Sequence, residues 1–114
     1  MSSFRDSNLN RANVALTADV SSVQGGGVIT TLFNVYSIVA NAGDAATLPA
    51  AFIVGDLIYV KNDDAVNSMD VFPASGDNAG AGTNVAVAVA AGDFAVFMAT
   101  VDNSAWTKIL GGTA

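Results

Sequence analysis

Short segments of alternating side chains, separated by turn residues, dominate the chain between residues 55 and 110. The most regular of them covers residues 84–91, where valines alternate with alanines. Four further segments share this strand-like character and lie at residues 57–61, 69–72, 94–101 and 105–110. Such strands, at roughly ten-residue spacing with Gly, Pro, Asn and Asp between them, are typical of antiparallel sandwiches and barrels. We therefore expect an all-β fold, an antiparallel β-sandwich or barrel of jelly-roll-like type.

Three consecutive glycines at positions 25–27 interrupt the N-terminal part of the chain. Apolar and polar side chains alternate over residues 14–20, which indicates a short strand or an extended arm. Residues 28–39 are rich in β-branched and aromatic side chains and predict one long strand, or two strands with a kink. A chain of 114 residues has the size of one domain. We expect an extended N-terminal arm over residues 1–24 and a β domain over residues 28–114.

The segment at residues 84–91 carries valine on one face and alanine on the other, so neither face is polar. A strand of this kind is usually covered on both sides. The second sheet would cover one side, and a neighbouring copy of the chain would cover the other. The pattern therefore favours a homo-oligomer.

The chain contains no His, Cys or Glu, and its ten acidic residues are all Asp. Without His, the serine and threonine hydroxyls lack the usual base that activates a nucleophile. Paired carboxylates for glycoside hydrolysis would need two acids in different environments across a cleft, and most of these aspartates neighbour Gly or Asn, as turn residues do. We expect no enzyme activity and no cofactor.

The formal net charge is −6, with four Lys and Arg residues in all. Phosphate backbones and anionic membranes need clustered positive charge, so we expect neither a nucleic-acid nor a membrane partner. The sequence also predicts no transmembrane helix and no signal peptide. Arg5 and Arg11 give the N-terminal segment a basic character, whereas the body is acidic. The segment is therefore suited to contact an acidic neighbour, such as another subunit, although a solvated tail has the same composition.

Several predicted turns contain aspartate. Asp63-Asp64, Asp77-Asn78 and Asp102-Asn103 could supply oxygen ligands for calcium, but their spacing does not match an EF-hand loop. Gly-Asp occurs four times, at Gly43, Gly55, Gly76 and Gly92. Glycine permits positive φ, and Asp bonds nearby backbone N–H groups. We interpret these acids as turn residues and expect no metal site.

Trp106 is the only tryptophan of the chain. With Tyr36 and Tyr59 it could form a stacking platform for a sugar, but a lone Trp near a last strand is more typical of a core plug or an interface anchor. The glycine-rich loop at residues 74–83 predicts an exposed tip or a second contact with a partner. The candidate partner-binding residues are Phe4, Arg5, Arg11, Ser75, Asp77, Asn78 and Trp106.

A series of motifs between residues 48 and 110 resembles small structural proteins of tailed bacteriophages. In those proteins a strand ending in an Asn turn is followed by a strand ending in a Pro-x-x-Gly loop, and a last strand carries Trp. The corresponding segments here are Leu48-Pro49, residues 55–62, residues 69–76, residues 89–93, residues 97–99 and Trp106. The resemblance covers a little over half of the chain. Apart from Leu48-Pro49, residues 1–54 match no motif that can be named.

The resemblance implies a virion component, above all a capsid decoration or cement protein. Such proteins are β-rich, often trimeric, and lie on the outside of the shell where capsid subunits meet. It implies the major capsid protein as partner, a homo-oligomer with a trimer favoured, synthesis in the host cytoplasm, and a final place on the capsid exterior. A fibre, collar, neck or tail component has the same sequence features, and so does a carbohydrate- or receptor-binding β module.

Overall fold

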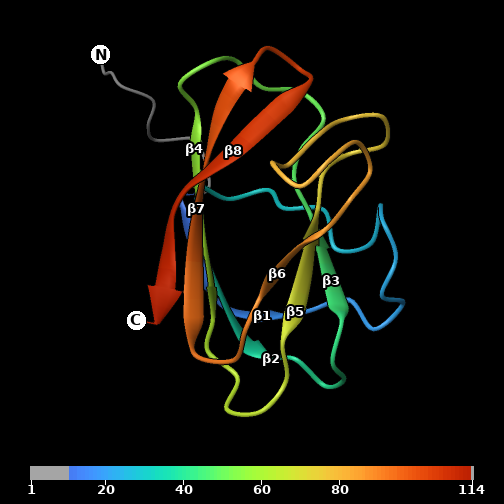
Figure 1. The fold of residues 1–114 in the computed structure, drawn as a ribbon. Helices are drawn as coiled ribbons and strands as arrows, with labels where there is room; N and C mark the ends of the chain where they lie inside the picture. Colours follow the sequence, from blue (N-terminus) through green and yellow to red (C-terminus); the bar gives the residue numbers. More distant parts are fainter. Residues whose placement is uncertain (1–10, 114) are drawn as a thin grey trace.

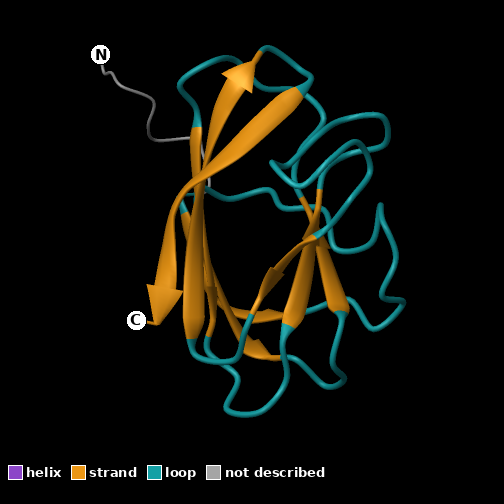
Figure 2. Ribbon diagram, in the orientation of Figure 1, coloured by secondary structure: helices purple, strands orange, loops and turns teal. Residues whose placement is uncertain are grey.

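The computed structural model describes residues 11–113, which form two β-sheets and no helix (Figures 1 and 2). The larger sheet has the strand order β1-β2-β4-β7-β8, with bounds Ala12–Thr17, Phe33–Ile38, Leu57–Asn62, Asp93–Val101 and Ala105–Thr113. The smaller sheet has the order β3-β5-β6, with bounds Asp44–Thr47, Met69–Phe72 and Val87–Val89. The all-β expectation is confirmed. Within the described residues, no helix is long and apolar enough to cross a membrane.

One hydrophobic core lies between the two sheets. Ile58 and Val60 of β4 and Phe97 of β7 enter it from the larger sheet, and Met69 and Val71 of β5 enter it from the smaller one. Strands direct successive side chains to opposite faces, so every second residue of β4 and of β5 is buried here. The burial patterns of β4 and β7 alternate in this way along most of each strand.

Both sheets are mixed, which corrects the expectation of antiparallel sheets throughout. Three of the six strand pairs are parallel, namely β1 with β2, β2 with β4 and β3 with β5. From β2 to β5 the chain passes from one sheet to the other at every step. Strands β2 and β4 therefore become neighbours in the larger sheet, and β3 and β5 become neighbours in the smaller sheet. Both pairs are parallel. The larger sheet keeps β1 and β8 as its two edges and does not close into a barrel.

The second half of the predicted N-terminal arm is part of the β domain. Residues 12–17 form the edge strand β1, and Asp19 exchanges two backbone hydrogen bonds with Ala45 of β3. The three glycines pack against β3, because Thr47 Oγ1 accepts from Gly25 N and donates to Gly26 O. A Cβ at Gly27, whose φ is +60°, would lie 2.9 Å from the carbonyl oxygen of Ala45. The glycines therefore allow the chain to pack closely against β3. Residues 1–10 of the predicted arm lie outside the described residues.

The predicted strands are found, with three differences. The strand predicted over residues 28–39 is limited to β2, Phe33–Ile38, and Val28 forms only an isolated bridge with Thr47. The segment Asp44–Thr47 is a strand, β3, which is not among the strands expected from the sequence. Strand β6 covers Val87–Val89, which is shorter than the predicted segment, and Ala88 on its outward side is exposed within the described part of the chain. All four glycines of the Gly-Asp repeat have positive φ, between 81° and 97°, which confirms the predicted turn chemistry.

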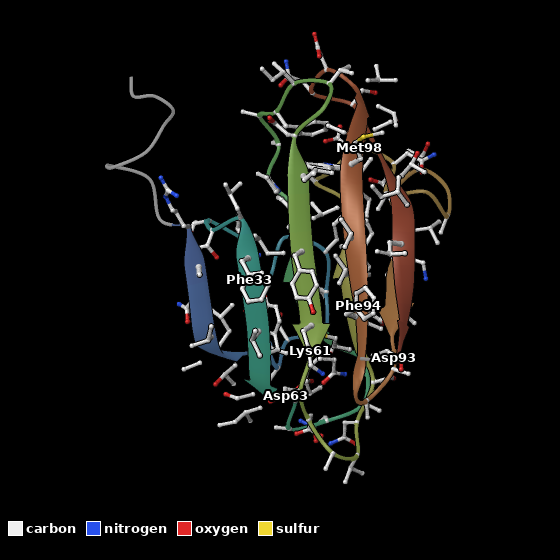
Figure 3. All side chains as sticks on the ribbon, turned by 90° about the vertical axis from the view of Figure 1, so that its left-hand side faces the viewer. Phe33, Lys61, Asp63, Asp93, Phe94 and Met98 are labelled. Atoms are coloured by element: carbon white, nitrogen blue, oxygen red, sulfur yellow. The ribbon has the colours of Figure 1, made fainter. Side chains whose placement is uncertain are left out.

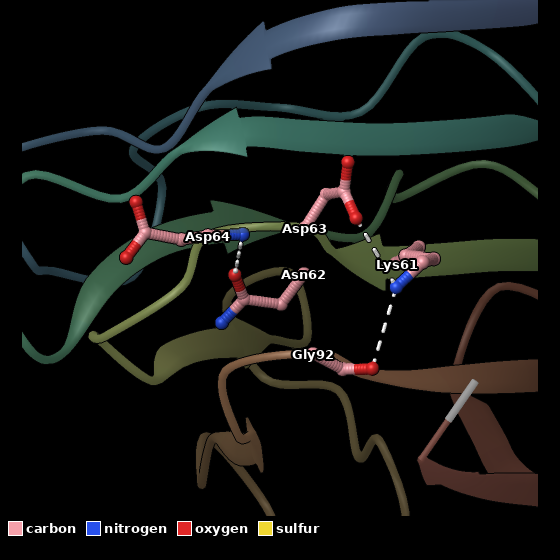
Figure 4. A network of polar contacts seen from close by, with 5 residues as sticks. All are labelled: Lys61, Asn62, Asp63, Asp64 and Gly92. Atoms are coloured by element: carbon pink, nitrogen blue, oxygen red, sulfur yellow. Dashed lines mark hydrogen bonds and ion pairs between the residues drawn. The ribbon is translucent and has the colours of Figure 1, made fainter.

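Asn62, at the end of β4, links the two sheets through its buried side chain. Its Nδ2 donates to Val89 O of β6 at 3.0 Å and to Asn67 O at 2.8 Å. Its Oδ1 accepts from Asp64 N at 3.0 Å, which begins the turn after the strand (Figure 4). Each polar atom of this buried amide therefore has a partner, as buried polar groups require.

The loop at residues 74–84 packs against the start of β8. Asn78 N donates to Ser104 O, and Trp106 N donates to Asn78 O at 2.7 Å. The Asn78 side-chain oxygen accepts from the backbone N–H groups of Gly80 and Gly82 inside the loop. Ala79 is fully buried. The loop is thus anchored at its centre.

Candidate functional site: the outer face of the five-stranded sheet

The side of the larger sheet that faces away from the core is apolar. Because side chains alternate along a strand, the residues between the core positions of β2, β4, β7 and β8 point outward. Figure 3 views this side and shows that no described strand covers it. We call it the outer face and define it by eight side chains: Phe33, Val35, Leu57, Tyr59, Phe94, Val96, Met98 and Leu110.

Three aromatic rings form a row across the centre of the outer face. Strand pairing places Phe33 of β2 beside Tyr59 of β4, and their rings stack with centroids 4.4 Å apart at an interplanar angle of 5°. The ring of Phe94 on β7 continues the row, 5.7 Å from Tyr59. Aromatic pairs at these separations contribute about 0.5–1.5 kcal/mol beyond their burial. These stacking contacts therefore stabilise the arrangement of the three rings in a row.

Aliphatic side chains extend this surface on either side. Val96 lies opposite Tyr59 and also opposite Leu110 of β8, and Met98 lies opposite Leu57. Phe33 is 42% exposed, Leu57 49% and Leu110 59%. Complete burial of such a side chain is worth about 1.5–3 kcal/mol, so a partner that covered several of them would gain substantial binding energy.

The charges near the outer face lie at its margin. Lys61 Nζ is 3.4 Å from Asp63 Oδ1 and donates to Gly92 O at 3.3 Å (Figure 4). Lys61, Asp63 and Asp93 all lie at the end of β4 and the start of β7, below the aromatic row in Figure 3. An apolar centre with a charged margin is the usual arrangement of a protein–protein interface.

Asp64, next in the chain, closes the turn at this margin. Its carboxylate accepts hydrogen bonds from the backbone N–H groups of Asn67, Val66 and Val39. These bonds stabilise the ionised form and lower the pKa of Asp64 below its ordinary value. The turn is therefore held by a carboxylate that remains charged in moderately acidic solution.

The loop acids that could have bound calcium do not form a site in the described residues. Across residues 11–113 no group of three or more acidic side chains is close enough together to hold a metal ion. Asp102 instead accepts a backbone hydrogen bond from Val54 at 2.8 Å, and Asp64 accepts three. These acids act as hydrogen-bond acceptors in turns.

Of the candidate partner-binding residues that the sequence indicated, the described ones do not all lie on the surface. Ser75 is exposed and Asp77 and Asn78 are half-buried in the loop described above, where desolvation raises the pKa of Asp77. Trp106 is 1% exposed and packs on Phe52, so it is a core residue rather than a stacking platform for a sugar. Arg11 is exposed at the start of β1. Phe4 and Arg5 lie outside the described residues.

Sequence reasoning missed the outer face, although a signal for it exists. Residues 57–60 and 94–98 are apolar at both alternating positions, as residues 84–91 are. Such a segment indicates a strand that is covered on both sides. Applied to β4 and β7, that rule would have predicted the outer face.

Comparison with known proteins adds no assignment to these observations. No family model matches the chain, and no curated protein matches it.

Proposed function

We propose that this protein is a structural protein of a bacteriophage virion, a capsid decoration (cement) protein that docks through its outer face. The observation that carries the proposal is the apolar, aromatic surface of β2, β4, β7 and β8, with its charges at the margin. An uncovered apolar surface of this kind usually marks an interaction site. The resemblance of residues 48–110 to small phage structural proteins supplies the class of partner.

The absence of His, Cys and Glu from the chain supports a binding function rather than an enzymatic one. We propose no cofactor and no nucleic-acid or membrane partner, because the net charge of −6 disfavours anionic ligands. Within the all-β class, we propose a sandwich of the two sheets, which the core between them supports. Jelly-roll connectivity is not part of the proposal, because three strand pairs are parallel.

In this proposal the partner is the major capsid protein, and the docked form is a homo-oligomer, with a trimer favoured. Several weak contacts made by one oligomer add up through their high effective concentration. A ligand that binds the assembled shell in preference to its separated subunits stabilises the shell, by about 2.7 kcal/mol per site at a hundred times its dissociation constant. The protein would be made in the host cytoplasm and act on the capsid exterior. The same surface would serve a tail, fibre or neck component.

The aromatic row favours one alternative of another class. Sugar rings stack on exposed aromatic faces, so a carbohydrate- or receptor-binding module would use Phe33, which is 42% exposed, rather than Tyr59, whose ring lies between those of Phe33 and Phe94. A reproducible signal on a glycan array that Phe33→Ala abolishes would favour this alternative over the capsid proposal.

The capsid proposal is tested with purified shells that lack the protein. We expect the added protein to sediment with the shells and to raise the temperature at which they break. No sedimentation, together with unchanged shell stability, would contradict the proposal. Labelling of tails rather than heads in electron micrographs would replace the decoration function with the tail or fibre alternative.

A further inference from the structure

A small pocket lies between β1, β2 and the segment formed by residues 27–31. Its volume is about 90 Å³. None of its ten lining residues is charged. Because such a lining offers an ion no opposite charge, the pocket is suited to a neutral polar molecule. Six of the lining residues carry a hydroxyl or an amide group, namely Asn13, Thr17, Thr30, Thr31, Asn34 and Tyr36.

Two of these polar side chains are bonded to each other. Thr31 Oγ1 donates to Asn34 Oδ1, and Asn34 Nδ2 donates to the Thr31 carbonyl oxygen at 3.0 Å. Asn13, Thr17 and Thr30 are exposed, so the pocket opens to solvent on their side. The pocket therefore has one wall that needs no ligand and one side through which a small molecule can enter.

The hydroxyl group of Tyr36 has no hydrogen-bond partner among the described residues. The residue is 4% exposed, and burial is the cause of the raised pKa of its phenol. Across residues 11–113, Trp106 Nε1 is the only fully enclosed side-chain nitrogen or oxygen without a partner, so the Tyr36 oxygen is not fully enclosed. Since Tyr36 is otherwise buried and lines the pocket, the accessible surface of its oxygen lies in the pocket. Nearly all buried polar groups are hydrogen-bonded, so this hydroxyl indicates a bound partner.

The volume and the chemistry of the pocket fit water. One water molecule occupies about 30 Å³ in the liquid, so the pocket has room for about three. Sites for drug-sized ligands measure about 300–1,000 Å³, and this pocket is too small for them. A phenol both donates and accepts hydrogen bonds, and water does the same. The hydroxyl and amide groups of the lining supply the roughly two to four polar partners that a buried water needs.

We propose that the pocket binds a cluster of about three ordered water molecules that connects the Tyr36 hydroxyl to Thr30 and to the polar side chains of β1. Strand β1 is exposed along its length except for Leu16, which is half-buried. Apolar packing therefore contributes little to holding this edge strand in place. Water-mediated hydrogen bonds are nearly as favourable as direct ones, and here they attach β1 to the buried Tyr36. The inference goes beyond the docking function and does not depend on it.

A crystal structure at high resolution, from crystals grown without polyols, tests the proposal directly. We expect electron density for water at about 2.5–3.0 Å from Tyr36 Oη, the distance of an O–H···O hydrogen bond. The density should continue toward Asn13, Thr17 or Thr30. A hydroxyl without density at hydrogen-bond distance would overturn the proposal. A saturable shift of the Leu16 and Ile29 methyl resonances at millimolar glycerol would overturn the assignment to water and give the pocket to a small polyol.

Stability provides a second test, in which two tyrosines are compared. Tyr36→Phe removes the hydroxyl that binds the cluster and should raise the equilibrium constant of unfolding roughly tenfold at neutral pH, the effect of about one hydrogen bond. Tyr59→Phe is the matched control, because it removes the same atom from a half-buried side chain of the outer face, and it should change the constant by no more than about twofold. Urea unfolding measures both variants. If the hydroxyl has no bound partner, Tyr36→Phe will be neutral or stabilising, and that result would overturn the proposal.

Discussion

The two faces of the five-stranded sheet have similar composition but different surroundings. The inner face carries Ile58, Val60 and Phe97, each no more than 4% exposed, under the three-stranded sheet. The outer face carries Phe33, Leu57 and Leu110, each more than 40% exposed. The two faces therefore do not differ in apolar composition. They differ because the three-stranded sheet covers the inner face and no described strand covers the outer face. The inner face accounts for stability, and we propose the outer face as the docking surface.

The sharpest way to separate the two faces is to remove one phenylalanine from each. Phe97→Ala, in the core, should lower the free energy of unfolding by about 3–5 kcal/mol, since it loses burial and leaves a cavity. Phe33→Ala should cost roughly 1 kcal/mol, the value of its stacking on Tyr59. Urea unfolding of both variants measures the difference. Equal losses would show that the outer face is also part of the core.

A second comparison uses Tyr36, whose side chain points from β2 to the inner side. Burial raises the pKa of Tyr36 from 10.0 to about 12, because the phenolate form is desolvated. The stability that this neutral phenol provides is fully present below pH 10 and is lost as the pH rises from 10 through about 12. At about 1.4 kcal/mol per pKa unit, the loss should total roughly 2–3 kcal/mol.

Unfolding free energies measured from pH 9 to pH 12 test this prediction for Tyr36. Tyr36→Phe removes the ionisable hydroxyl and should flatten the profile over that range. An identical decline in the variant would mean that another group causes it.

Adjacent residues on β4 give a third comparison between the inner and outer sides. Asn62→Ala should lower the unfolding free energy by about 1–3 kcal/mol, because it leaves Val89 O and Asn67 O without their donor. Lys61→Ala removes a surface ion pair and should cost about 0–1 kcal/mol. Thermal unfolding of the two variants measures both effects. The account of Asn62 as a link between the sheets fails if the lysine variant is the less stable.

The smallest expected effect concerns the margin of the outer face. Hydrogen bonds from Asn67, Val66 and Val39 lower the pKa of Asp64, so its carboxylate contributes stability above the ordinary value of 3.8. That contribution should disappear as the pH falls through the lowered pKa. Asp64→Asn should remove this part of the acid dependence, and Asp63→Asn should retain it. Circular dichroism during acid titration distinguishes the two variants.

The strands themselves could be predicted from the sequence, but several of their partners could not. Residues 69–72 were predicted as a strand and form β5, and alternation correctly placed turns after Asn62 and before Ala105. Strand β3 was missed because Asp44, Ala45 and Ala46 have low strand propensity and form a strand through their pairing with β5. Parallel pairing was missed because a two-residue period indicates only on which face of the sheet each side chain lies. It does not indicate which strands are neighbours.

The candidate site was less predictable than the fold. Trp106 stands out by composition, yet it is buried. Phe33, Tyr59 and Phe94 stand far apart in the chain and meet only through the register of β2, β4 and β7. That register depends on the whole sheet, so no local motif could reveal the aromatic row.

The central claim, that the outer face is the docking surface, is tested most directly by binding to shells that lack the protein. The test variant combines Phe33→Ser, Leu57→Ser and Leu110→Ser. The matched control combines Val23→Ser, Val66→Ser and Val85→Ser, which are also exposed but do not belong to the outer face. We expect the test variant to bind at least roughly a hundredfold more weakly than the wild type, or about 2.7 kcal/mol, and the control to keep its affinity. Wild-type affinity in a folded test variant would contradict the account.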